Sequence, residues 1–223
     1  MRNILNNRRI QQVTCAILGI CSALLLMMAV HTRSEVWKEG KMQKTQQGLA
    51  EEVLRFHVLA NSDSEADQKQ KLSVRDAILS YLKENLPAGS SKGETEIWVQ
   101  EHLKDIVGCA EETLAKAGSS DSVQAEIAMS YFPDKYYEDL WFPKGYYQAL
   151  RIIIGEGDGH NWWCVLYPNL CITEASSVVV SERGKEELEH ILTEEEYETV
   201  TISTKFEIKS FLWEKVGGLL GKE

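Results

Sequence analysis

The longest uninterrupted apolar stretch of the chain lies close to its first residue. The stretch Ile10–Thr32 contains no Asp, Glu, Lys or Arg, and its apolar centre is Val13–Val30. A helix over this centre spans about 27 Å, which is close to the thickness of the hydrocarbon core of a bilayer. A core helix of a globular domain would carry a polar face, and this stretch has none. The pattern therefore predicts a helix that enters or crosses a membrane.

The residues that flank the apolar stretch bear on its orientation and processing. Arg2, Arg8 and Arg9 precede it, and basic residues at this place favour a cytoplasmic N-terminus. A signal-peptidase site needs small residues at the minus-three and minus-one positions. The segment Met27–Arg33 offers no such pair, which favours a retained anchor. We expect residues 1–33 to be a signal peptide or signal-anchor and the polar residues 34–50 to be a linker.

Beyond residue 50 the pattern first predicts a strand and two helices. Leu54–Val58 alternates apolar and polar residues, as in a strand with one buried face. Ser62–Glu65 fits a capping box that begins a helix running to about Leu86. Apolar residues at steps of three and four then predict a helix over Glu94–Ala117, with Gly118 just beyond its end.

The second half of the chain is predicted to consist mainly of strands. Ser122–Phe132 alternates strictly, and Tyr146–Ile154 ends in three isoleucines, which indicates burial on both faces. Trp162–Tyr167 is apolar again. An acidic helix is expected over Glu182–Glu198, and an amphipathic helix over Phe206–Leu220. The order predicts an α+β fold: a small antiparallel or mixed sheet packed with two long helices, preceded by one N-terminal transmembrane or signal helix.

Charge separates the beginning of the chain from the rest. The first 44 residues carry seven Lys and Arg against two Asp and Glu, a net charge of +5, whereas the remainder carries 17 against 32, a net charge of −15. An acidic body excludes nucleic acid as the main partner, because phosphate binding needs clustered positive charge. We expect residues 51–181 to form the extracytoplasmic α+β domain and residues 182–223 an acidic and amphipathic C-terminal extension.

Cysteine and histidine residues allow two chemical interpretations. Cys164 could be a nucleophile with His57 or His160 as its base, because a thiolate needs a neighbouring imidazolium. The alternative, a buried thiol or a disulfide between Cys164 and Cys171, is favoured, since two nearby thiols outside the cytoplasm persist as a disulfide. A zinc site at His160, Cys164 and Cys171 is weakly supported, because structural sites use four ligands.

Two further interpretations concern the segment from Tyr131 to Cys171, which is rich in aromatic residues. Glu156–Asn161 could hold calcium, but it lacks the regular acidic ligands of an EF-hand, and its glycines fit a turn. The aromatic residues could instead form an exposed platform for a partner. Its members would be Tyr136, Tyr137, Trp141, Phe142, Tyr146 and Tyr147. We expect the partner contact within Tyr131–Trp163, at Trp141 first, with Tyr137 and Asp158 as further candidates.

Four blocks of this sequence resemble the stage II sporulation protein R family. The first is Leu54–Asp76, which reads LRFHVLANSDSEADQKQKLSVRD. The others are Tyr131–Tyr136, Pro143–Tyr146 and Gly155–Pro168, and the last reads GEGDGHNWWCVLYP. The resemblance covers about Leu54–Ile172. None of the blocks is a catalytic signature, but together they are specific.

The resemblance implies a signalling protein of endospore formation. Members of the family are made in the forespore and exported into the space between the two septal membranes. There they activate a membrane-embedded aspartic protease of the mother cell, which processes the sigma factor E precursor. The resemblance thus implies an activating ligand without a cofactor or metal, not an enzyme. The alternative is a cell-envelope cysteine hydrolase or wall-binding module that uses Cys164 and the aromatic cluster.

Overall fold

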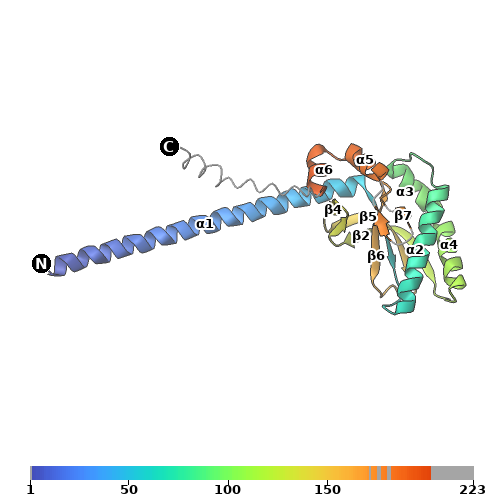
Figure 1. Ribbon diagram of the computed structural model, residues 1–223, viewed down its shortest axis with the longest axis horizontal. Helices are drawn as coiled ribbons and strands as arrows, with labels where there is room; N and C mark the ends of the chain where they lie inside the picture. The colour runs from blue at the N-terminus through green and yellow to red at the C-terminus, as the bar shows by residue number, and fades with distance from the viewer. Residues whose placement is uncertain (1, 171, 175–176, 180–181, 202–223) are drawn as a thin grey trace, which may run out of the picture. The chain divides into compact units, whose positions relative to one another are not determined.

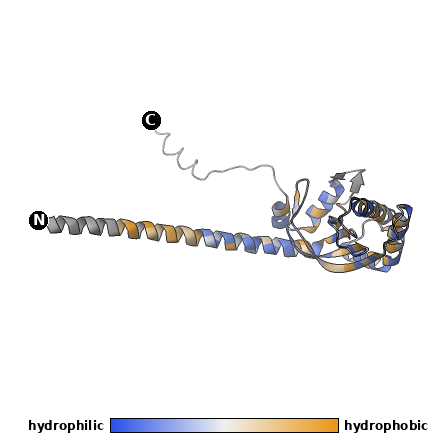
Figure 2. Cartoon of the chain, turned by 90° about the horizontal axis from the view of Figure 1, so that it is seen from below, coloured by the Kyte–Doolittle hydropathy of each residue, from blue (hydrophilic) through white to orange (hydrophobic). Residues whose placement is uncertain are grey.

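The computed structural model describes residues 2–170, 172–174, 177–179 and 182–201, which form two compact units. The first unit, residues 1–47, consists of most of helix α1 (Arg2–Glu52). Large apolar side chains from Ile17 to Val30 are exposed along it, and the orange band in Figure 2 marks this part of α1. By length and composition α1 can span a membrane, as the sequence predicts.

The second unit begins at Gly48 and contains a mixed four-stranded sheet in the order β2-β5-β1-β6 (Figure 1). Its strands are β1 (Leu54–Leu59), β2 (Val123–Phe132), β5 (Gly145–Ile154) and β6 (Asn161–Tyr167). The central strands β1 and β5 are parallel, whereas β2 and β6 run antiparallel to their neighbours. The fold is therefore α+β with a mixed sheet, which confirms the predicted class.

Three helices cover one face of this sheet. They are α2 (Glu65–Asn85), α3 (Lys92–Glu101) and α4 (Leu103–Lys116). Helix α2 packs on β1 and α4, while α3 and α4 pack on β2. The core on this side joins Phe56 and Val58 of β1 to Val74 and Ile78 of α2, all fully buried. The apolar stripes of the helices fix which face they bury.

Two helix boundaries differ from the prediction. The N-cap of α2 is Ser64, whose side chain accepts a hydrogen bond from the Asp67 amide, so Ser62 is not the cap. The helix predicted over Glu94–Ala117 is divided at His102, which ends α3 and precedes α4. Its end is as predicted, because Gly118 follows the C-cap with a φ of +79°, a conformation that glycine adopts at little cost.

Short elements complete the described part of the second unit. Strands β3 (Lys135–Tyr137) and β4 (Leu140–Phe142) form a hairpin, and β7 (Ile172–Glu174) pairs with β8 (Ser177–Val179). The acidic helix expected over Glu182–Glu198 is two helices, α5 (Glu182–Ile191) and α6 (Glu194–Val200). They are separate because Thr193 begins α6 with a capping box. The amphipathic helix expected over Phe206–Leu220 lies outside the described residues.

Candidate functional site

Strand β1 carries two polar side chains that are buried on the sheet face opposite the three helices. The sequence predicts one buried face for this strand, and that prediction is wrong, because Arg55 is 0% exposed and His57 is 4% exposed. In the parallel register Arg55 lies beside Ala149, and His57 lies beside Arg151. The β3–β4 hairpin supplies two of the aromatic side chains around Arg55, Tyr137 and Phe142, and so helps to bury this second face.

The guanidinium group of Arg55 is enclosed by aromatic rings. Its central carbon lies 4.3 Å from the ring centre of Phe132, 5.1 Å from that of Phe142 and 5.0 Å from that of Tyr147. The Nε atom donates to the carbonyl oxygen of Cys164 at 2.9 Å, and Nη2 donates to the Tyr137 hydroxyl at 3.1 Å. Cation–π attraction thus joins the hairpin to the sheet. Burial lowers the pKa of Arg55.

This arrangement places Tyr137 in the interior. Its side chain is 7% exposed, and its hydroxyl donates to the carbonyl oxygen of Trp163 at 3.2 Å. Burial raises the pKa of this hydroxyl. Trp141, the first candidate for the partner contact, lies on β4 opposite Tyr136 and is half-buried, with its indole nitrogen enclosed. Of these two residues, only Trp141 presents any substantial surface.

His57 lies between aromatic rings rather than beside a thiol. Its ring stacks on Trp163 with the centres 5.0 Å apart and also contacts Phe132 at 5.2 Å. Desolvation by burial, together with the nearby charges of Arg151 and Arg55, lowers the pKa of His57 to about 3. The imidazole is therefore neutral near pH 7. Cys164 pairs with Phe56, whose side chain points to the helix side, so His57 and Cys164 face opposite sides of the sheet.

Cys164 itself is 0% exposed and disulfide-bonded. A buried sulfur in a disulfide offers no thiolate, so the geometry gives no support to a hydrolase that uses Cys164 as its nucleophile. Cys171, the expected partner of Cys164, lies outside the described residues, and their pairing stays a prediction. Cys15, Cys21 and Cys109 are free.

A polar cluster forms where the turn after β1 meets the loop between β5 and β6. Asp63 accepts hydrogen bonds from the amide of His160, at 2.6 Å, and from its ring nitrogen Nδ1. These bonds lower the pKa of Asp63. Lys71 on α2 donates to the carbonyl oxygen of His160 at 2.8 Å. On the other side of the turn, Asn61 Oδ1 accepts from the amide of Glu156 at 3.0 Å.

Glycine makes this close contact between the two loops possible. A Cβ atom at Gly159 would lie 2.2 Å from the backbone oxygen of Ser62, so only glycine fits there. Asp158 is exposed beside it, and its amide donates to the carbonyl oxygen of Asn61 at 3.2 Å. The structure thus brings together two blocks that are far apart in the sequence, Leu54–Asp76 and Gly155–Pro168. Among the described residues, no group of three or more His, Cys, Asp or Glu side chains is placed to hold a metal ion.

The largest exposed apolar side chains of the sheet lie at one end of β2 and β5. Met129 is 63% exposed, Tyr131 is 51% exposed and Tyr146 is 62% exposed. Tyr131 and Tyr146 are direct cross-strand partners, with ring centres 5.5 Å apart. All three lie on the helix-side face, where alternation predicts burial. The sequence does not reveal their exposure, because it does not show how far the helices extend over the sheet.

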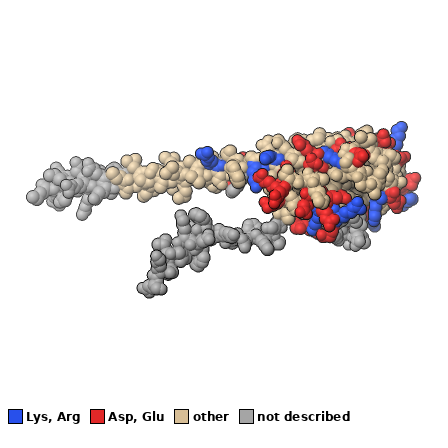
Figure 3. All heavy atoms as spheres, turned by 90° about the horizontal axis from the view of Figure 1, so that it is seen from above, with Lys and Arg blue, Asp and Glu red and all other residues tan. Residues whose placement is uncertain are grey.

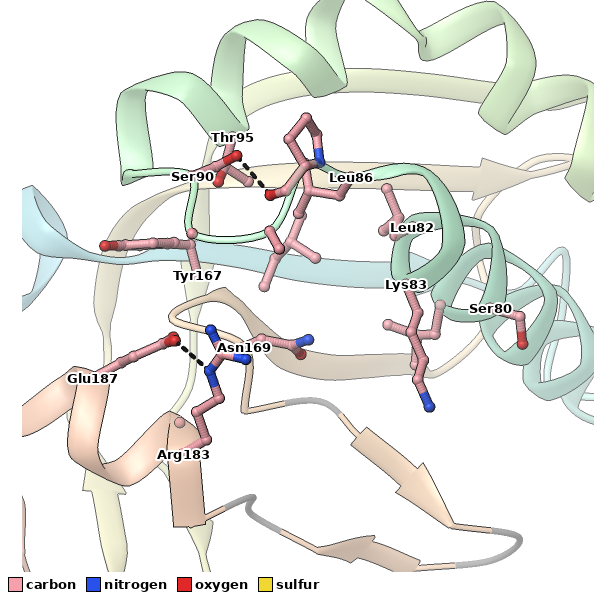
Figure 4. Close-up of a pocket in the computed structure, with 16 residues that line it drawn as sticks. Ser80, Leu82, Lys83, Leu86, Ser90, Thr95, Tyr167, Asn169, Arg183 and Glu187 are labelled. Atoms are coloured by element: carbon pink, nitrogen blue, oxygen red, sulfur yellow. Dashed lines mark hydrogen bonds and ion pairs between the residues drawn. The ribbon is translucent and has the colours of Figure 1, made fainter.

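A pocket of about 360 Å³ opens between the end of α2, the loop that follows it and α5 (Figure 4). Its apolar wall includes Leu82 and Leu86, and Thr95 contributes a buried hydroxyl without a partner among the described residues. Arg183 and Glu187 of α5 pair at 3.1 Å at its edge. No sequence motif predicts this pocket, because its residues come from four separate segments.

Together these features define an α+β protein with an N-terminal helix able to enter a membrane, and with aromatic and polar surfaces suited to contacts. Residues 50–177 match the family described as Stage II sporulation protein R. The chain is also 34% identical over 168 residues to Stage II sporulation protein R of Bacillus subtilis (strain 168), covering 74% of this chain and 75% of that protein. No solved structure matches. The chain therefore belongs to the stage II sporulation protein R family and has a role in sporulation.

Proposed function

We propose that this chain is an intercellular signalling protein of sporulation. It is made in the forespore, delivered across the forespore membrane by its N-terminal helix, and acts in the space between forespore and mother cell. There its second unit activates the membrane-embedded aspartic protease that processes the sigma factor E precursor in the mother cell. Family membership is the observation that carries this proposal, since the match covers residues 50–177, the larger part of the second unit.

The chemistry of the second unit supports a binding role. Its one buried histidine has a pKa of about 3 and faces away from Cys164, which is itself disulfide-bonded. The pairing of Asp63 with His160 and of Lys71 with the backbone of His160 holds two loops together. Exposed aromatic side chains supply large contact areas at low entropic cost.

Deletion of the gene in a sporulating host tests this function. We expect the sigma factor E precursor to accumulate uncleaved in the mother cell, as followed by immunoblotting through sporulation. Expression of the full chain in the forespore should restore cleavage. Normal cleavage in the deletion strain would overturn the proposal. A change in cell-wall composition with normal cleavage would point to a wall-directed role instead.

A further inference from the structure

At the outer edge of the sheet, main-chain groups without a partner among the described residues lie beside exposed apolar side chains. Strand β2 is the outermost strand next to β5, and no described strand lies on its other side. It is ten residues long, and it carries no proline or lysine. Natural proteins protect long edge strands with such residues, with bulges or with covering elements, because an open edge pairs with other chains. Strand β2 pairs with β5 without an irregularity.

The antiparallel ladder shows which main-chain groups of β2 point outward. The amide of Gly155 donates to the carbonyl oxygen of Ser122 at 2.8 Å, so Ser122 and Gly155 form a hydrogen-bonded pair. Hydrogen-bonded and non-hydrogen-bonded pairs alternate along such a ladder. The N–H and C=O groups of Ile127, Met129 and Tyr131 therefore point away from β5. These residues also carry the apolar side chains of the strand, and two of the three are exposed.

Charge determines what kind of partner fits this edge. Helices α3 and α4 pack on β2 and carry six carboxylates against three lysines. The carboxylates belong to Glu94, Glu96, Glu101, Asp105, Glu111 and Glu112, and the lysines are Lys92, Lys104 and Lys116. The chain beyond residue 44 has a net charge of −15, and carboxylates are spread over the face of the second unit seen in Figure 3. Like charges disfavour a second copy of the chain, whereas a basic segment is attracted.

We propose that the outer edge of β2 is a docking surface for an extended segment of the partner protein, which adds to the sheet as a fifth strand. The segment is apolar at the positions that meet Met129 and Tyr131 and carries lysine or arginine beside them. Main-chain hydrogen bonds supply affinity in this mode of binding, and the side-chain contacts supply specificity. This proposal rests on the proposed function, and the partner is the protease that the chain activates.

Lysine substitutions on the edge test the proposal in the full chain expressed in the forespore. Met129→Lys and Tyr131→Lys remove apolar contact and place a positive charge where the basic segment docks. We expect each to lower the rate of precursor cleavage about tenfold or more, as for residues at the centre of an interface. Leu72→Lys is the matched control, because Leu72 is 40% exposed but lies on α2. It should change the rate less than about twofold.

Further variants and controls decide each part of the proposal. Immunoblotting must show equal amounts of exported protein for all variants. Met129→Glu should impair cleavage less than Met129→Lys, and the reverse order would overturn the basic character of the partner. Normal cleavage with both lysine variants, in a strain where deletion of the gene abolishes cleavage, would overturn the docking surface but not the proposed function. Normal cleavage after deletion would overturn both.

A photo-crosslinking residue at position 131 identifies the occupant of the edge. We expect an adduct with the protease, identified by mass spectrometry, and no such adduct from position 72 on α2. An adduct between two copies of this chain would overturn the proposal in favour of self-association. An adduct from position 136 alone would place the contact on the β3–β4 hairpin and overturn the edge as the docking surface.

Discussion

Arg55 and His57 show how a pair of residues can be buried against the expectation from their type. Neither side chain forms a salt bridge among the described residues, and Arg55 is surrounded by aromatic rings at 4.3 to 5.9 Å. A buried cation without a carboxylate is costly. The rings and the hydrogen bonds to Tyr137 and to the Cys164 carbonyl offset this cost and hold the hairpin on the sheet.

The lowered pKa of His57 predicts a pH dependence of stability. The folded protein keeps His57 neutral down to about pH 3, whereas the ordinary value in an unfolded chain is 6.5. The unfolded state therefore binds a proton first as the pH falls. The stabilisation is complete above about pH 6.5 and is lost progressively between about pH 6.5 and pH 3, by about 2 kcal/mol at pH 5.

Denaturant unfolding of the wild type and of His57→Phe at pH 7 and pH 5 measures this effect. The variant keeps an aromatic ring but has no group to titrate, so its stability should fall less over this range. His190→Gln, at an exposed position on α5, should retain the wild-type pH dependence. Asp63 and Asp67 also have lowered pKa values. Because their ordinary pKa is 3.8, they change the free energy of unfolding mainly below about pH 4, outside the range from pH 7 to pH 5. An equal fall in wild type and His57→Phe would contradict the assignment.

At the scale of elements, the β3–β4 hairpin joins two parts of the second unit. Its turn contains Glu138, which has a φ of +53°, and both turn carboxylates lie near Lys185 of α5, with Asp139 Oδ1 at 2.8 Å from Nζ. These interactions raise the pKa of Lys185 and lower that of Asp139. Tyr137 and Phe142 point inward to Arg55. The hairpin is thus a structural clamp, and its free surface is the part that carries Tyr136 and Trp141.

Trp141→Ala distinguishes a contact role of this hairpin from a packing role. Trp141 is half-buried, so we expect a loss of stability below the 3–5 kcal/mol that is typical of a fully buried tryptophan. If Trp141 contacts the partner, precursor cleavage should fall while the protein stays folded. Thermal unfolding beside the cleavage assay separates the two effects. A stable and fully active variant would remove Trp141 from the contact surface, and an unfolded variant would assign it to the core.

The predicted disulfide would join Cys164 of β6 to Cys171. A bond between Cys164 and Cys171 would close a short loop around Pro168 and contribute about 2–3 kcal/mol if its geometry is unstrained. Mass spectrometry of non-reduced protein from cells should show the linked peptide. Cys164→Ser and Cys171→Ser should then destabilise the protein equally. Two free thiols at these positions in the exported protein would refute the pairing.

At the scale of the whole molecule, the chain consists of two structurally different units. The first supplies an apolar helix, and the second contains the sheet, its helices and the residues matched to the family. The boundary lies within α1, because Leu49 and Val53 are fully buried in the core of the second unit. The linker expected over residues 34–50 is therefore helical, and its last residues belong to the folded unit.

Truncation before Val36 separates folding from export. The shortened chain keeps Leu49 and all later core residues, so we expect a soluble protein with a cooperative thermal transition. Made in the forespore, it should fail to restore precursor cleavage because it lacks the apolar helix. Fusion of a cleavable export signal to the same fragment is the control and should restore cleavage if the second unit is sufficient. Activity of the unfused fragment would contradict the proposed topology.

The sequence by itself determined the features that depend on local patterns. The apolar helix, the order of the main strands, the end of α4 at Gly118 and the family all follow from short stretches of residues, because composition, period and motif are local properties. What only the tertiary structure decided is which surfaces are covered. Alternation assigns Met129 and Tyr131 to the same face as buried residues, and Arg55 to the opposite face, but coverage depends on elements distant in the chain. Since α3 and α4 leave one end of β2 open while the hairpin encloses Arg55, two apolar side chains are exposed and a cation is buried.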